Sequence, residues 1–134
     1  MSNNVSIINK QNGAGIRRIF KASHCSYKGF KAAWQHESAF RQELVLVTIM
    51  MPFSFLLSTS SHHWLMLVAS LLFLLFAEII NSALEALADK ICLSHDPLIG
   101  RAKDMGSAGV FLALCVLGLI WGEALYSAFY TQSY

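Results

Sequence analysis

The chain has 134 residues, enough for one domain. Hydrophobic residues make up 55% of it and Asp, Glu, Lys and Arg together only 13%, about half the charged share of a soluble domain. A soluble globule of this size could not bury so much apolar surface, so the composition excludes that class and indicates a membrane protein.

The first helix is predicted over residues 16–36, after a polar stretch of residues 1–15 that we expect to be a flexible leader. One helix face carries an apolar stripe at spacings of three and four: Ile16, Phe20, Ser23, Tyr27, Phe30 and Trp34. A basic stripe lies beside it: Arg17, Lys21, His24, Lys28 and Lys31. This pattern is typical of a helix lying in the lipid headgroup layer; packing against a soluble partner is the alternative.

Three membrane-spanning helices are predicted next, near residues 43–60, 64–86 and 107–128. No charged residue occurs over the 34 residues 44–77 or over residues 105–122. The first gap exceeds the roughly 20 residues of one span, and the polar run at 58–63 is expected to form a hairpin tip inside it. Pro97 and Gly100 predict a loop over 90–106. The fold class expected is therefore all-α, with a surface helix and three spans in a single domain over 16–134.

The basic residues predict the orientation. All ten Lys and Arg precede the first span or lie between the second and third, and none lies in the hairpin tip or the C-terminal tail. Because basic residues stay on the cytoplasmic side, the N-terminus is expected inside and the C-terminus outside.

Polar residues in the second predicted span are the strongest functional signal. Glu78, Asn81, Glu85 and Asp89 follow one another by three, four and four residues, so they share one helix face. We expect Glu78 to lie in the cytoplasmic third of the hydrocarbon layer, where inserting a carboxyl group costs about 2–3 kcal/mol. A protonated Glu78 bonded to a neighbouring helix is one explanation. We favour a general base that takes a proton from a lipid hydroxyl, with Glu85 holding a divalent cation.

Other predicted cytoplasmic segments bring charge to the same depth. Glu37, Arg41 and Glu43 precede the first span, and residues 100–107 lead into the third. Lys103 and the N–H groups at the start of the third helix are expected to act on a transferring phosphoryl group. No P-loop or protein-kinase pattern is present. The residues alone indicate a membrane enzyme or an ion pathway with acids at the inner face.

Two segments resemble a known family. The stretch Glu78-Ile-Ile-Asn-Ser-Ala-Leu-Glu85, followed by Asp89 and by Gly100-Arg-Ala-Lys-Asp-Met-Gly-Ser-Ala108, is similar to the signature of the small bacterial diacylglycerol kinases. The resemblance extends over about residues 16–125, through 28–34 and 37–43. It implies a homotrimer in the bacterial inner membrane with active sites shared between subunits, using Mg-ATP to convert diacylglycerol to phosphatidic acid.

The resemblance also implies residue roles. Glu78 matches the catalytic base, and Glu37 and Glu85 match the ligands of the Mg²⁺ that carries the ATP phosphates. The nucleotide-binding positions that it implies are Arg18, Glu37, Glu85, Lys103 and Asp104. The substrate-binding or supporting positions are Ser26, Trp34, Arg41, Glu43, Asn81, Asp89, Ser107 and Trp121.

The chain departs from the family pattern on the expected adenine side. Cys25 stands where an aromatic residue is found in a well-known member, with Tyr27 two residues on, and residues 94–97 also differ. An undecaprenol kinase, which shares the fold and the site, is the nearest alternative. A small oligomeric proton or cation channel and a non-catalytic scaffold are alternatives of other classes, but the scaffold leaves Glu78 unexplained.

Overall fold

The computed structural model describes residues 16–91 and 96–131, and every element in these two ranges is an α-helix. The helices are α1 (Ile16–His36), α2 (Ser38–Leu57), α3 (Ser61–Ile91) and α4 (Pro97–Thr131). The last three are long and apolar enough to cross a membrane. The predicted fold class, an all-α membrane protein with a first helix and three spans, is confirmed. The predicted leader, residues 1–15, lies outside the described residues.

The chain divides into two units, Met1–Ala32 and Ala33–Tyr134, with the boundary inside α1. In the first unit, the described side chains are exposed, including the apolar stripe of Phe20, Tyr27 and Phe30. An exposed apolar stripe on one face is the expected arrangement for a helix that rests on a lipid surface.

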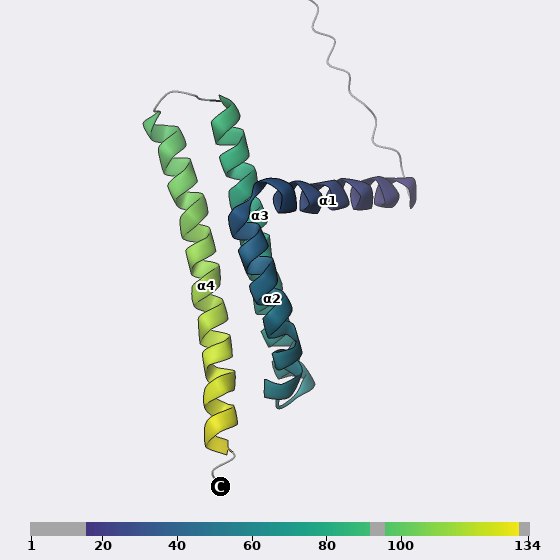
Figure 1. The fold of residues 1–134 in the computed structure, drawn as a ribbon, viewed down its shortest axis with the longest axis vertical. Helices are drawn as coiled ribbons and strands as arrows, with labels where there is room; N and C mark the ends of the chain where they lie inside the picture. Colours follow the sequence, from purple (N-terminus) through teal and green to yellow (C-terminus); the bar gives the residue numbers. More distant parts are fainter. Residues whose placement is uncertain (1–15, 92–95, 132–134) are drawn as a thin grey trace, which may run out of the picture. The chain divides into compact units, whose positions relative to one another are not determined.

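The three long helices pack through residues repeated at intervals of three, four or seven. In α3 the buried positions include Leu67, Leu71, Leu74, Glu78, Asn81 and Ala88; in α4 they include Ala113, Leu117, Trp121 and Ala124; in α2 they are Phe40, Val47 and Ser54. Such spacing keeps one seam of each helix toward its neighbours. Helix α3 contacts both α2 and α4 (Figure 1), so its seam is the best covered surface of the bundle.

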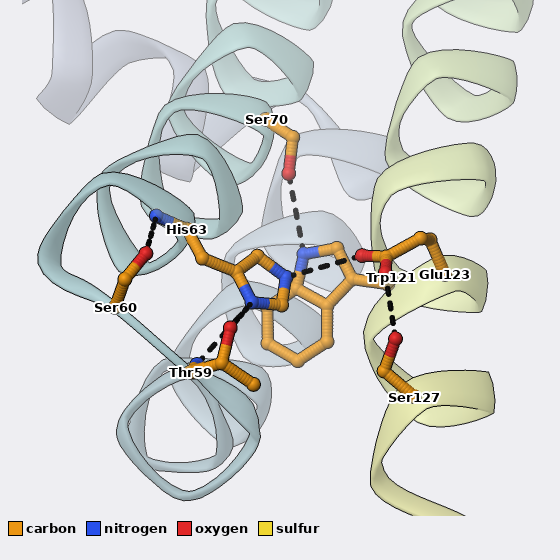
Figure 2. Close-up of polar contacts among 7 residues, drawn as sticks. All are labelled: Thr59, Ser60, His63, Ser70, Trp121, Glu123 and Ser127. Atoms are coloured by element: carbon orange, nitrogen blue, oxygen red, sulfur yellow. Dashed lines mark hydrogen bonds and ion pairs between the residues drawn. The ribbon is translucent and has the colours of Figure 1, made fainter. Parts of the chain in front are cut away.

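Polar side chains join the helices near the hairpin between α2 and α3. Trp121 Nε1 donates to Ser70 Oγ at 3.2 Å, and Trp64 Nε1 donates to Ser54 Oγ at 3.1 Å. Figure 2 shows His63 between the hairpin and α4, with Nε2 3.3 Å from Glu123 Oε2. The His63 Nδ1 atom accepts from the Thr59 backbone N–H at 3.3 Å. Together, these contacts hold α2, α3 and α4 to one another near the hairpin.

The prediction of a loop over 90–106 is wrong, because α3 continues to Ile91 and α4 already begins at Pro97. Asp96 Oδ1 accepts from the backbone N–H groups of Leu98 at 2.8 Å and Ile99 at 3.3 Å. Asp is a favoured N-cap, and proline suits the first helical position because it has no N–H to satisfy there. Pro97 is therefore the first residue of a helix and not part of a loop, and Gly100 lies in the first turn of that helix.

Candidate active site

Glu78 is the centre of the candidate site. Its residue is only 4% exposed, although it belongs to a helix that otherwise buries mostly apolar residues. Electrostatic interactions link its carboxylate with those of Glu37 and Glu85, and with that of Glu43. Three acids, from α2, α3 and the junction before α2, therefore lie close enough to Glu78 to repel its negative charge. A negative environment of this kind would favour a bound cation.

Glu37 lies at the junction between α1 and α2, where the backbone is extended (φ −109°, ψ 113°). It occupies the N-cap position of α2, but its side chain makes no capping hydrogen bond. The half-buried carboxylate is thus left for other contacts. Arg41 Nη1 donates to the Trp34 carbonyl at 2.9 Å, satisfying one of the carbonyls that a helix leaves free at its C-terminus. Arg41 therefore stabilises the junction that carries Glu37.

Asn81 and Glu85 form a pair one helical turn apart. Asn81 Nδ2 donates to Glu85 Oε1 at 3.3 Å, whereas Asn81 Oδ1 is buried without a hydrogen-bond partner in the described part of the chain. Glu43 Oε2 is buried and unpartnered in the same sense, whereas the Ser82 side chain interacts with Glu78. Buried polar atoms are normally satisfied, so the two unpartnered oxygens mark a region suited to a polar ligand.

Lys103 brings positive charge to the acids from α4. Its Nζ atom lies 2.9 Å from Asp89 Oδ1, and it also interacts electrostatically with Glu85. Asp89 lies one turn beyond Glu85 on the same face of α3, so the ion pair connects the C-terminal half of α3 with the N-terminal half of α4. The site then carries acids on one side and an ammonium group on the other.

An apolar groove of about 310 Å³ opens between α3 and α4 beside Asn81. Its lining is Phe73, Phe76, Ala77, Ile80, Asn81, Leu84, Met105, Gly106 and Gly109. A larger cavity of about 490 Å³ lies at the hairpin, among Ser58, Thr59 and Trp64. Chemistry distinguishes the two, because only the groove between α3 and α4 has one of the clustered polar residues, Asn81, in its wall.

Several other predicted site residues lie apart from Glu78 or stand exposed. Trp121 belongs to the core near the hairpin, with Val47 and Leu67, about 27 Å along α4 from Lys103 at 1.5 Å per residue. It supports the bundle there rather than touching the acids. The side chains of Trp34, Asp104 and Ser107 are exposed, and Arg18 and Ser26 are exposed on the separate first unit. Of the departing stretch 94–97, residues 94 and 95 lie outside the described residues.

The expected helix N-terminus beside Lys103 is displaced. Helix α4 begins at Pro97, six residues before Lys103 and ten before the predicted start of the third span. Asp96 accepts hydrogen bonds from two of the first N–H groups of the helix. The N–H groups of residues 103–107 lie inside the helix. The idea that free N–H groups there hold a phosphate is therefore wrong.

Two residues of the site were not predicted from the sequence. Ser82 is buried beside Glu78, and its spacing of four from Glu78 was the available signal. Gly106 presses against Asn81; a glycine inside a helix was the signal, but its partner could not be predicted.

Comparison with known proteins identifies the family. The family model for prokaryotic diacylglycerol kinase matches residues 24–125. The chain is 42% identical over 118 residues to a diacylglycerol kinase of Escherichia coli K12, covering 88% of this chain and 97% of that one. It is 38% identical over 112 residues to one from Haemophilus influenzae (84% and 95%) and 41% identical over 111 residues to one from Pseudomonas aeruginosa (83% and 90%). The chain belongs to the prokaryotic diacylglycerol kinase family.

Proposed function

We propose that this chain is an ATP-dependent lipid kinase that transfers the γ-phosphate of ATP to diacylglycerol and forms phosphatidic acid at the cytoplasmic membrane face. Family membership supports the kinase activity. The observation that carries the proposal is the buried Glu78 carboxylate, which lies in one of three long apolar helices and interacts with Glu37 and Glu85. Stability alone gives no reason for acids at this position.

In the proposed reaction, Glu78 is the general base. Its carboxylate accepts the proton of the lipid hydroxyl as the lipid oxygen bonds to the γ-phosphorus atom, and the bond between that phosphorus atom and the β–γ bridging oxygen breaks. ADP leaves with the bridging oxygen. Glu78 suits this role because Asn81, three residues further along α3, lies in the wall of an apolar groove from which a lipid alcohol can approach, whereas a water-exposed carboxylate would not meet that hydroxyl.

The acids also suit Mg²⁺. This ion prefers one or two carboxylates together with phosphate oxygens and water. Glu37 and Glu85 are the proposed ligands, since both are half-buried, both interact with Glu78, and Glu37 makes no competing cap bond. When bound, the ion would offset negative charge on the ATP phosphates. The unpartnered Glu43 Oε2 adds a further acceptor close by.

Lys103 is the proposed phosphate-binding cation of α4. Its ammonium group pairs with Asp89 and also interacts electrostatically with Glu85, and a lysine can act as a point charge on phosphate oxygens. Arg18, on the first unit, and Asp104 are the other proposed nucleotide contacts. Ser26, Trp34 and Ser107 are proposed to support lipid or nucleotide binding; their exposed positions are compatible with a ligand from outside the chain.

The groove beside Asn81 supports a lipid substrate. Its wall is apolar apart from Asn81, and its 310 Å³ can hold part of an acyl chain while the hydroxyl end faces the acids. We further propose insertion in the bacterial inner membrane with the N-terminus cytoplasmic, as the distribution of Lys and Arg favours. Assembly as a homotrimer is proposed from the family resemblance, and the many exposed apolar side chains of α2, α3 and α4 are compatible with it.

The decisive experiment offers purified chain labelled ATP with diacylglycerol and undecaprenol in parallel mixed micelles. We expect label in diacylglycerol, dependent on Mg²⁺. Label mainly in undecaprenol would replace the proposed substrate by the polyprenyl alcohol. Label in neither lipid, combined with cation flux in reconstituted vesicles, would overturn the kinase and favour a channel.

A further inference from the structure

Gly106 occupies an unusual place among the glycines of the described residues. A Cβ built on Gly106 would overlap Asn81 Oδ1 and would also contact Asn81 Cγ at 3.4 Å. At Gly100, Gly109, Gly118 and Gly122, which share α4 with Gly106, a Cβ would meet nothing within 4 Å. Glycine is unfavourable inside a helix compared with alanine, and at Gly106 the neighbouring carboxamide explains why only glycine fits.

The contact defines how Asn81 is oriented. Oδ1 points at the bare backbone of α4 and has no hydrogen-bond donor in the described part of the chain, while Nδ2 donates to Glu85 Oε1 at 3.3 Å. The reverse orientation would set the carboxamide oxygen against the Glu85 carboxylate and leave a buried amino group facing Gly106, which accepts nothing. Close approach to a Cα–H group is also a weakly favourable position for an oxygen atom.

We propose that Gly106 is a positioning residue, which leaves the space that Asn81 Oδ1 needs and thereby holds the Asn81 amino group on Glu85. This inference rests on the proposed function, in which Glu85 is a ligand of the metal that carries ATP. A methyl group at Gly106 pushes the Asn81 carboxamide out of its place, and the Glu85 carboxylate loses its orienting donor. The displacement occurs one helical turn from the proposed base, Glu78.

The test compares Gly106→Ala with two matched controls in the same helix, Gly118→Ala and Gly122→Ala. A Cβ added at either glycine would meet nothing within 4 Å, and neither glycine lines the groove beside Asn81. We expect kcat to fall on the order of 10- to 100-fold in Gly106→Ala, as for a small misplacement in a catalytic site, with the KM for diacylglycerol changed less than about 3-fold. Both controls should keep the wild-type kcat and unfold at the same or a higher temperature.

A double-mutant cycle separates positioning from general damage. In an Asn81→Ala background the carboxamide is absent, so adding Gly106→Ala should lower the residual activity by less than about 2-fold. Leu84 Cδ1 would be 3.5 Å from the added Cβ, an ordinary contact, so adding Leu84→Ala should not restore Gly106→Ala.

A readout independent of turnover is the side-chain amide resonance of Asn81, assigned in micelles by its loss in Asn81→Ala. It should shift in Gly106→Ala and stay in place in Gly118→Ala. Wild-type kcat in Gly106→Ala, equal losses in the Gly118→Ala control, or an undiminished effect in the Asn81→Ala background would overturn the proposal. Inactive wild-type protein would instead refute the kinase function itself, whatever the resonance does.

Discussion

Glu78 combines near-complete burial with a negative neighbourhood, and this combination makes it the residue most open to a decisive test. Glu78→Gln preserves the size of the side chain and removes its ability to accept a proton. Turnover should fall by at least about 100-fold, within the range of a lost general base. The protein should remain folded, because the repulsion of Glu78 by Glu37 and Glu85 is relieved. Initial rates with labelled ATP, together with size-exclusion profiles, measure both effects; near-normal turnover would show that another group takes the proton.

The proposed role of Glu85 as a metal ligand can be tested by the Mg²⁺ dependence of a variant. We expect Glu85→Gln to lose activity by an order of magnitude or more, since one of the two proposed carboxylate ligands is lost, and to regain part of it at high Mg²⁺. The Mg²⁺ concentration at half-maximal rate measures this. Glu123→Gln is the matched control, because Glu123 lies near the hairpin against His63; it should leave the Mg²⁺ dependence unchanged. Activity of Glu85→Gln that does not depend on divalent ions would rule out the ligand role.

The acidic face could be predicted because it depends on spacing alone. Glu78, Asn81, Glu85 and Asp89 recur at helical intervals, and any helix through them must present them together. The partners from other helices could not be predicted in the same way. Which atom of α4 meets Asn81, and that Lys103 pairs with Asp89, depends on how two helices pack, and that packing is determined by many side chains at once.

The start of α4 could not be predicted from Pro97 and Gly100, because both residues commonly end helices. An Asp directly before a Pro is also typical of a helix start, and the hydrogen bonds that Asp96 accepts from Leu98 and Ile99 show that a helix begins here. The consequence is functional. Lys103 lies inside a regular helix, whose geometry fixes its position relative to α3, instead of on a loop.

This start can be tested by comparing two variants of one residue. Asp96→Ala removes the cap acceptor and should destabilise the protein by about 1 kcal/mol, whereas Asp96→Asn keeps a good acceptor and should cost much less. Amide hydrogen exchange at Leu98 and Ile99 should accelerate in Asp96→Ala only. Equal exchange and equal thermal stability in the two variants would mean that the cap contributes nothing to the start of α4.

The bundle as a whole divides its tasks along its length. Near the hairpin, tryptophan–serine hydrogen bonds and the His63–Glu123 contact hold the helices together (Figure 2); toward the other end lie the acids and Lys103. Composition and charge-free gaps were enough to predict the number of spans, because the bilayer sets their length. The oligomer could not be obtained from these patterns, since lipid and a second copy of the chain cover an apolar helix face equally well.

The division along the bundle has meaning only if the acids face the ATP-containing side, so the orientation itself needs a test. Two single-cysteine variants are compared, and both have Cys92 and Cys115 replaced by Ser. The first keeps the natural Cys25, which is exposed on α1. In the second, Cys25 is also replaced and Ser61→Cys supplies a cysteine at the start of α3. Because all ten Lys and Arg lie on the side of Cys25, a membrane-impermeant maleimide should label Ser61→Cys in spheroplasts, and Cys25 only once the membrane is opened. Labelling of Cys25 in sealed spheroplasts would place the acids outside, away from cellular ATP, and the kinase mechanism would then have no phosphoryl donor.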